Sequence, residues 1–130
     1  MTDSALKELI SSSLTLAGAL PHLDLLHYLL TEAGGKHTAH CLDLDLATVG
    51  KSQKDAASKL DDLVKAHIEL ALATGQLTNL STRAPQAYWK QFAEGKRIVL
   101  KPTTLHIQIP ESVQVVPVPE SELQILAHAA

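Results

Sequence analysis

The sequence predicts an α+β domain in which a small antiparallel sheet carries a long packed helix. Two apolar segments, at about 24–32 and 37–49, flank the pair Gly34-Gly35. A Gly-Gly pair between two apolar runs is typical of a β-hairpin turn. The next segment has apolar residues at steps of three and four, which indicates an amphipathic helix. At 130 residues the chain can bury a core of its own, so we expect a single domain over 1–130.

The long helix is expected to begin at Gln53 and to end before Gly75. The Ser52 hydroxyl can cap the backbone three residues later, where Asp55 replaces the usual Glu of a capping box. A glycine just past the last periodic residue is a favourable C′ residue, because it adopts positive φ without a Cβ clash. One stripe of this helix should face the sheet: Ala56, Leu60, Leu63, Val64, His67, Ile68 and Ala71. His67 is expected to be a hydrogen-bonded core or boundary residue.

Shorter elements are expected around this core. We divide the domain into an N-terminal arm or short helix (1–22), a core hairpin with its helices (23–95), and C-terminal short strands with a tail (96–130). Proline suits the first turn of a helix, so a short helix should follow Pro85 and stop near Gly95. The other expected elements are a helix over 4–17, strands at 98–100, 105–109 and 113–116, and one or two apolar helical turns within 121–130.

Composition and charge exclude several function classes. The net charge is −3 and the pI about 6.1, so the chain as a whole lacks the basic excess on which non-specific nucleic-acid binding depends. A single cysteine cannot form an internal disulfide, which fits a reducing compartment. The N-terminus lacks a basic start, and no apolar run approaches the roughly 20 residues of a membrane span. We expect a cytoplasmic protein that does not contact membranes.

The stretch AHCLDLDL is the first candidate site, because His40, Cys41, Asp43 and Asp45 lie within six residues. On a strand, Asp43 and Asp45 would share one face, with His40 and the leucines on the other. We therefore interpret the stretch as a half-exposed strand with its leucines in the core and Cys41 as a small buried hydrophobe. No catalytic, cofactor or metal set is predicted, although a metal-assisted hydrolase or nuclease using Asp43 and Asp45 stays open as an alternative.

The stretch PQAYWKQF is the second candidate site. It contains Tyr88, Trp89 and Phe92, with Lys90, Lys96 and Arg97 close by. Aromatic and basic residues together are typical of protein-binding hot spots and of surfaces that stack nucleic-acid bases. Packing against the sheet is the competing interpretation for at least one face of this helix. We take Tyr88, Trp89 and Phe92 as the possible partner-binding residues.

The order of these motifs resembles the HicB-like antitoxin family and its uncharacterised relatives. In that family the second strand of a hairpin carries Ala-x-Cys-x-Asp/Glu before a glycine, and a Thr/Ser-x-x-Glu-Ala helix start follows. The residues that carry the resemblance are Ala39, Cys41, Asp43, Gly50, Ser52, Asp55 and Ala56. Ala84-Pro85 and Tyr88-Trp89 also look like a segment of some relatives, so the resemblance covers about 25–92.

This resemblance implies a β-β-β-α-β fold, of partial RNase H-like or double-stranded-RNA-binding-like type. It implies a non-enzymatic antitoxin that neutralises a small RNA-degrading toxin and forms homo-oligomers, here through a strand edge or the aromatic segment. Family members repress their operon through an appended ribbon-helix-helix or helix-turn-helix segment. This proline-punctuated C-terminus has no basic recognition helix, so DNA binding does not carry over. An RNA-binding module is the alternative function.

Overall fold

The computed structural model describes residues 25–98, 104–108 and 120–130. Within them the chain forms a mixed six-stranded sheet with two α-helices, one of them long. The predicted α+β class is therefore confirmed. The elements in order are β1 (Leu25–Ala33), β2 (Lys36–Cys41), β3 (Leu46–Gly50), α2 (Gln53–Thr74), the 3-10 helix η2 (Leu77–Leu80), α3 (Gln86–Glu94), β4 (Lys96–Ile98), β5 (Thr104–Gln108) and β6 (Glu120–Ala129). The predicted N-terminal arm and the predicted strand at 113–116 lie outside the described residues.

The predicted hairpin is confirmed, but its second strand is shorter than expected. Gly34 and Gly35 join β1 to β2 with φ of 59° and 81°, which favours glycine at both positions. The prediction of one strand over 37–49 is wrong, because residues 42–45 form a turn between β2 and β3. Asp45 has φ 53° in this turn, a left-handed conformation that aspartate tolerates better than most residues.

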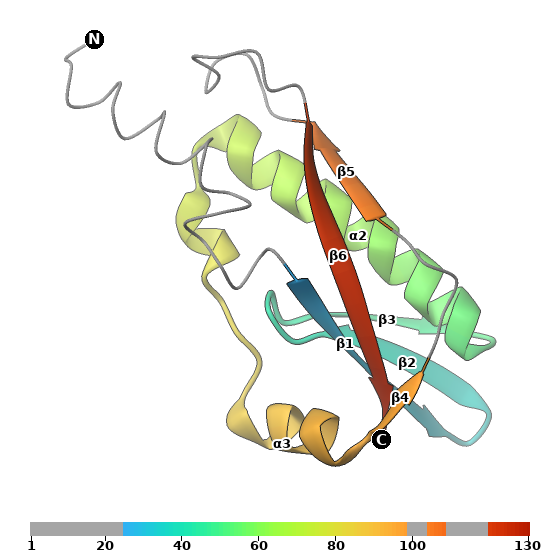
Figure 1. Ribbon diagram of the computed structural model, residues 1–130. Helices are drawn as coiled ribbons and strands as arrows, with labels where there is room; N and C mark the ends of the chain where they lie inside the picture. The colour runs from blue at the N-terminus through green and yellow to red at the C-terminus, as the bar shows by residue number, and fades with distance from the viewer. Residues whose placement is uncertain (1–24, 99–103, 109–119) are drawn as a thin grey trace, which may run out of the picture.

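β6 lies in the middle of the sheet, whose strand order is β3-β2-β1-β6-β4, with β5 also paired to β6. It runs parallel to β1, and β4 and β5 pair antiparallel with its other edge (Figure 1). The prediction of helical turns and a tail within 121–130 is therefore wrong. Leu123 and Ala127 alternate with outward-facing residues and enter the core, so pairing with β1 overrides the helix propensity of this alanine-rich segment.

Helix α2 packs across one face of the sheet (Figure 1). The Ser52 side chain accepts a hydrogen bond from the Asp55 N–H at 3.0 Å, and Gly75 has φ 72°, so both predicted helix ends are confirmed. The stripe prediction holds except at Leu63, which is 37% exposed. The core between helix and sheet contains Leu26, Tyr28 and Leu30 from β1, Ala39 and Cys41 from β2, and Leu60, Val64 and Ile68 from α2.

Helix α3 covers part of the opposite face. Its Phe92 packs with Leu29 and Leu42. The neighbours of these two leucines in the chain, such as Tyr28 and Cys41, point to the other face and pack under α2. The backbone N–H of Ala84 donates to the Leu42 carbonyl at 2.8 Å and ties the segment before α3 to the turn after β2. Among the described residues, α3 contacts this second face at β1, the turn after β2 and β6, and its Tyr88 reaches His40 of β2. The candidate site lies here.

Candidate functional site

Asp43 of the AHCLDLDL stretch is a buried structural carboxylate. Its side chain is 1% exposed and accepts a hydrogen bond from the His27 backbone N–H at 2.6 Å. The His27 ring nitrogen Nδ1 lies 3.1 Å from the second carboxylate oxygen, within hydrogen-bond distance. These contacts hold the turn after β2 against β1, and the buried charge is satisfied by donors that the fold supplies.

Asp45 is engaged by a different histidine. His40 Nε2 lies 2.7 Å from Asp45 Oδ1, and the Asp45 side chain is 38% exposed. The two aspartates therefore do not share a strand face as predicted, and each has its own imidazole. Among residues 25–98, 104–108 and 120–130, no group of three His, Cys, Asp or Glu side chains is placed to hold a metal ion.

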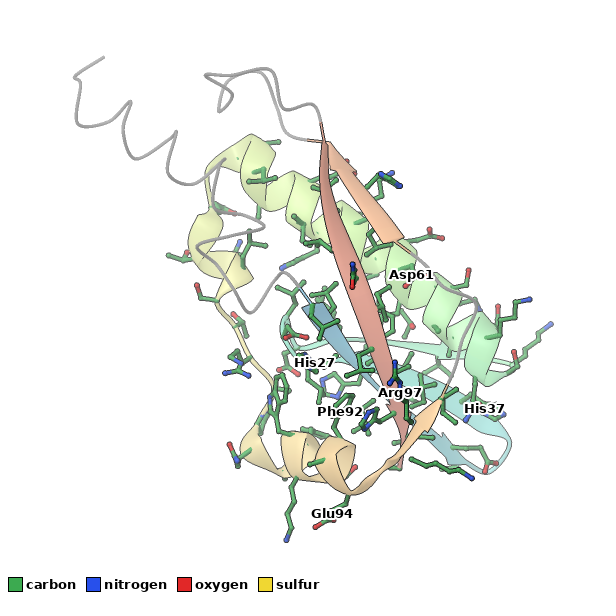
Figure 2. The ribbon with its side chains drawn as sticks, in the orientation of Figure 1. His27, His37, Asp61, Phe92, Glu94 and Arg97 are labelled. Atoms are coloured by element: carbon green, nitrogen blue, oxygen red, sulfur yellow. The ribbon has the colours of Figure 1, made fainter. Side chains whose placement is uncertain are left out.

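Phe92 and Trp89 are held between α3 and the sheet by histidines. The His27 ring meets Trp89 edge-on at 5.2 Å between centroids and Phe92 at 5.3 Å. Figure 2 shows His27 and Phe92 close together between α3 and the strands of the sheet. Phe92 is 7% exposed, so we assign this side chain to packing and keep Tyr88 and Trp89 as the candidate contact residues.

Arg83, which precedes α3, stacks on the partly buried ring of Trp89. The Arg83 guanidinium carbon lies 4.4 Å from the Trp89 ring centroid, a cation–π geometry, and Trp89 Nε1 donates to the Ala84 carbonyl at 3.2 Å. An open depression lies here, lined by Arg83, Ala84, Gln86 and Trp89. Tyr88 is 40% exposed and contacts the His40 ring at 4.8 Å between centroids. The indole and guanidinium are thus fixed before any partner arrives.

Positive charge gathers in the same segment. Residues 83–98 hold four of the 11 basic residues and one of the 14 acidic residues, which gives +3 in a chain of net charge −3. The basic residues are Arg83, Lys90, Lys96 and Arg97, and the acidic one is Glu94. Lys90 lies 4.0 Å from Glu94, whereas the other three form no ion pair with any residue that the structure describes.

The opposite face of the sheet holds two buried polar groups that do not form a site. The Tyr28 hydroxyl donates to Asp61 Oδ1 at 2.8 Å, and burial raises the pKa values of both groups. Burial, with the nearby Asp43 charge, also raises the pKa of the Cys41 thiol to about 12. A thiol of such high pKa is not a nucleophile at neutral pH, and the prediction of a small buried hydrophobe is confirmed.

His67 Nε2 lies 3.2 Å from the Asn79 carbonyl, as expected of a boundary histidine.

The sequence interpretation missed His27, His128 and Arg83. His27 and Asp43 are 16 positions apart, and neither a motif nor a periodicity connects them. Arg83 precedes the aromatic stretch, and its proximity to Trp89 in the sequence was a signal that could have been used.

Among the described helices, none is both long and apolar enough to cross a membrane. Comparison with family models, curated proteins and solved structures gives no significant match to this chain.

Proposed function

We propose that this chain is a HicB-like, non-enzymatic binding module of the antitoxin type, which binds and neutralises a small RNA-degrading toxin protein. One observation carries the proposal. The carboxylate Asp43 is buried and holds the fold, whereas Arg83 and Tyr88 are exposed on either side of the start of α3, beside the partly buried Trp89. The order of three antiparallel strands, a long helix and a strand parallel to the first also agrees with the resemblance.

The surface formed by Arg83, Tyr88 and Trp89 has the character of a hot spot. Arginine, tyrosine and tryptophan are enriched among residues that dominate binding energies. Arg83 is already ordered on the Trp89 ring, so a partner loses less conformational entropy when it binds the guanidinium. A planar guanidinium recognises carboxylates in a bidentate manner. We therefore expect an acidic group beside an apolar one on the toxin surface.

RNA binding is the second candidate, and the charge of +3 in residues 83–98 favours it. The observation against RNA binding is that other side chains already contact the Trp89 ring. Arg83 occupies one face of Trp89, and His27 lies edge-on to the indole, so this ring is not free to stack on a base. The hydrolase alternative has less support, because Asp43 and Asp45 are each bound by a separate histidine.

Co-expression with the product of the adjacent open reading frame tests the proposal. We expect the wild-type chain to co-purify with that product and to relieve its toxicity to growing cells. A variant with Arg83→Ala and Tyr88→Ala should lose both effects. Leu70→Ser is the matched control, because Leu70 is 63% exposed on the distant helix α2 and should be neutral. Absence of a complex together with absence of relief would contradict the antitoxin function.

RNA binding is measured separately with single-stranded oligonucleotides at low salt. Binding that weakens steeply with added salt, and that is lost in the same Arg83 variant, would replace the toxin proposal. Loss of oligonucleotide integrity that depends on a divalent ion and is abolished by Asp43→Asn would favour the hydrolase alternative.

A further inference from the structure

The outer edge of strand β3 has the features of an interface. Among the strands that the structure describes, β3 is the terminal one, next to β2 (Figure 1). Its sequence LATVG contains neither a charged residue nor a proline, the devices with which edge strands usually avoid pairing. Ala47 is exposed, and Val49 is 53% exposed on the side of the sheet away from α2. An uncharged edge with an exposed β-branched residue favours pairing with another strand.

The strand register shows which backbone groups this edge offers. The N–H of Leu42 donates to the carbonyl of its β1 partner His27, and the same alternation continues along the hairpin. Even-numbered residues of β2 therefore point their backbone groups to β1, and odd-numbered ones point to β3. Ala39 faces Thr48, so Thr48 bonds to β2, while the N–H and C=O groups of Ala47 and Val49 point away from the sheet.

This pattern is complementary to itself. When two β3 strands pair antiparallel about Thr48, Ala47 of one copy lies opposite Val49 of the other. Ala47 of one copy and Val49 of the other then exchange N–H···O bonds, and the two-fold symmetry generates a second, identical pair. The exposed Val49 side chain packs on the small Ala47 of the other copy, which adds a cross-strand apolar contact.

Charges flanking the edge are complementary in the same register. Asp45 precedes β3 and Lys51 follows it, and pairing about Thr48 places these two residues opposite each other across the interface. Asp45 is bound to His40 through its Oδ1 oxygen, and its side chain is 38% exposed. Lys51 is exposed, and its ammonium forms no ion pair within the part of the chain that the structure describes.

We propose that two copies of this chain form a two-fold dimer by antiparallel pairing of their β3 edges, centred on Thr48. The interface contains two Ala47–Val49 backbone pairs and, at its ends, two Asp45–Lys51 ion pairs. The partner is a second copy of this chain. A two-fold rotation about Thr48 places the outward-pointing residues Ala47 and Val49 opposite each other, and it places Asp45 opposite Lys51. The α3 surface takes no part, so dimerisation and toxin binding can fail independently.

Sedimentation analysis of the full chain over a concentration series tests the dimer. We expect wild-type protein to approach twice the monomer mass of 14.0 kDa. Val49→Pro removes an N–H that points outward from the sheet. Proline is tolerated at such a position of an edge strand, so this variant should be a folded monomer. Val49→Thr keeps both the N–H and the β-branched shape and should remain dimeric. A monomeric wild type, or a folded Val49→Pro variant that is as dimeric as wild type, would overturn the proposal.

A charge variant keeps the test decisive if Val49→Pro fails to fold. Lys51→Glu sets like charges opposite each other at both ends and should raise the dimer dissociation constant about tenfold, whereas Lys51→Arg should preserve it. The effect of Lys51→Glu should shrink at high salt, because exposed charges are screened. A dissociation constant unchanged by Lys51→Glu would contradict the register about Thr48.

Discussion

The imidazole of His128 lies flat on the ring of Phe92, with centroids 3.9 Å apart and planes 5° from parallel. Its Nδ1 is 2.8 Å from the carbonyl oxygen of the same Phe92, near the C-terminal end of α3. One residue of the central strand β6 therefore holds both the side chain and the backbone of a residue in α3. Phe92 thus joins α3, which carries Trp89, to the sheet by both its side chain and its backbone.

Truncation of Phe92 should release this attachment. Phe92→Ala is expected to cost about 3 kcal/mol of unfolding free energy, while Phe92→Leu, which keeps most of the apolar volume, should cost about 1 kcal/mol. Urea denaturation followed by circular dichroism gives the free energies. The fluorescence of Trp89, the single tryptophan, reports on α3 in the same samples. Equal stabilities of the two variants would contradict this role of the ring.

Gly50 should not tolerate a side chain. A Cβ at this position would clash with the backbone nitrogen of Ala56, where β3 approaches the start of α2. Because that contact is with backbone, Gly50→Ala must shift the helix or the strand and should cost about 2 kcal/mol or more. Thermal unfolding measures the loss, and Ala66→Ser, at an exposed position of α2, is the neutral control. A wild-type midpoint for Gly50→Ala would show that the two elements can separate without cost.

Ionisation of Asp61 should destabilise the fold. Burial raises its pKa above the ordinary value of 3.8, although the hydrogen bond from Tyr28 opposes this. A raised folded-state pKa means that stability is fully present below 3.8 and falls as pH rises through the folded-state value. Asp61→Asn cannot ionise and still accepts the Tyr28 hydrogen bond. Its stability relative to wild type should therefore increase from pH 4 toward pH 7, as followed by urea titration at each pH; a constant difference would be inconsistent with this shift.

Cys41 should resist alkylation in the folded protein. Its thiol is fully buried, and the pKa of about 12 leaves little thiolate at pH 8. From the thiolate fraction alone we expect reaction with iodoacetamide to be roughly 1,000-fold slower than in the denatured chain. Mass spectrometry of timed samples, with and without urea, measures both rates. Comparable rates would mean that the β2 region opens readily in the native state.

Local signals predicted the hairpin and the long helix well. The Gly34-Gly35 turn, the Ser52 cap and the Gly75 terminus each depend on a few adjacent residues, and all three are confirmed. β6 was mistaken for helical turns because its strand conformation depends on pairing with β1, about one hundred positions earlier. The pairing of Asp43 with His27 was missed for the same reason, since it joins the turn after β2 to a distant strand.

The candidate site was predicted only in part. Clustering of Tyr88, Trp89 and Phe92 on one helix followed from their spacing, and α3 spans Gln86–Glu94 as expected. Which of them faces outward depends on the histidines beneath α3, and these come from three different strands. The oligomer and the toxin partner stay predictions until the experiments above are made.

The central position of β6 determines when this protein can finish folding during synthesis. β1, β4 and β5 all take hydrogen-bonding partners from β6, which is the last described strand to leave the ribosome. The hairpin, β3 and α2 can assemble earlier, because their contacts are local. Closing the sheet requires Leu25 to meet Gln124, a long loop that slows the final step. A chain that ends before residue 120 would therefore leave the β6-facing edge of β1 open and β4 and β5 without a strand partner, and nascent chains of this length should be the ones that chaperones and proteases bind.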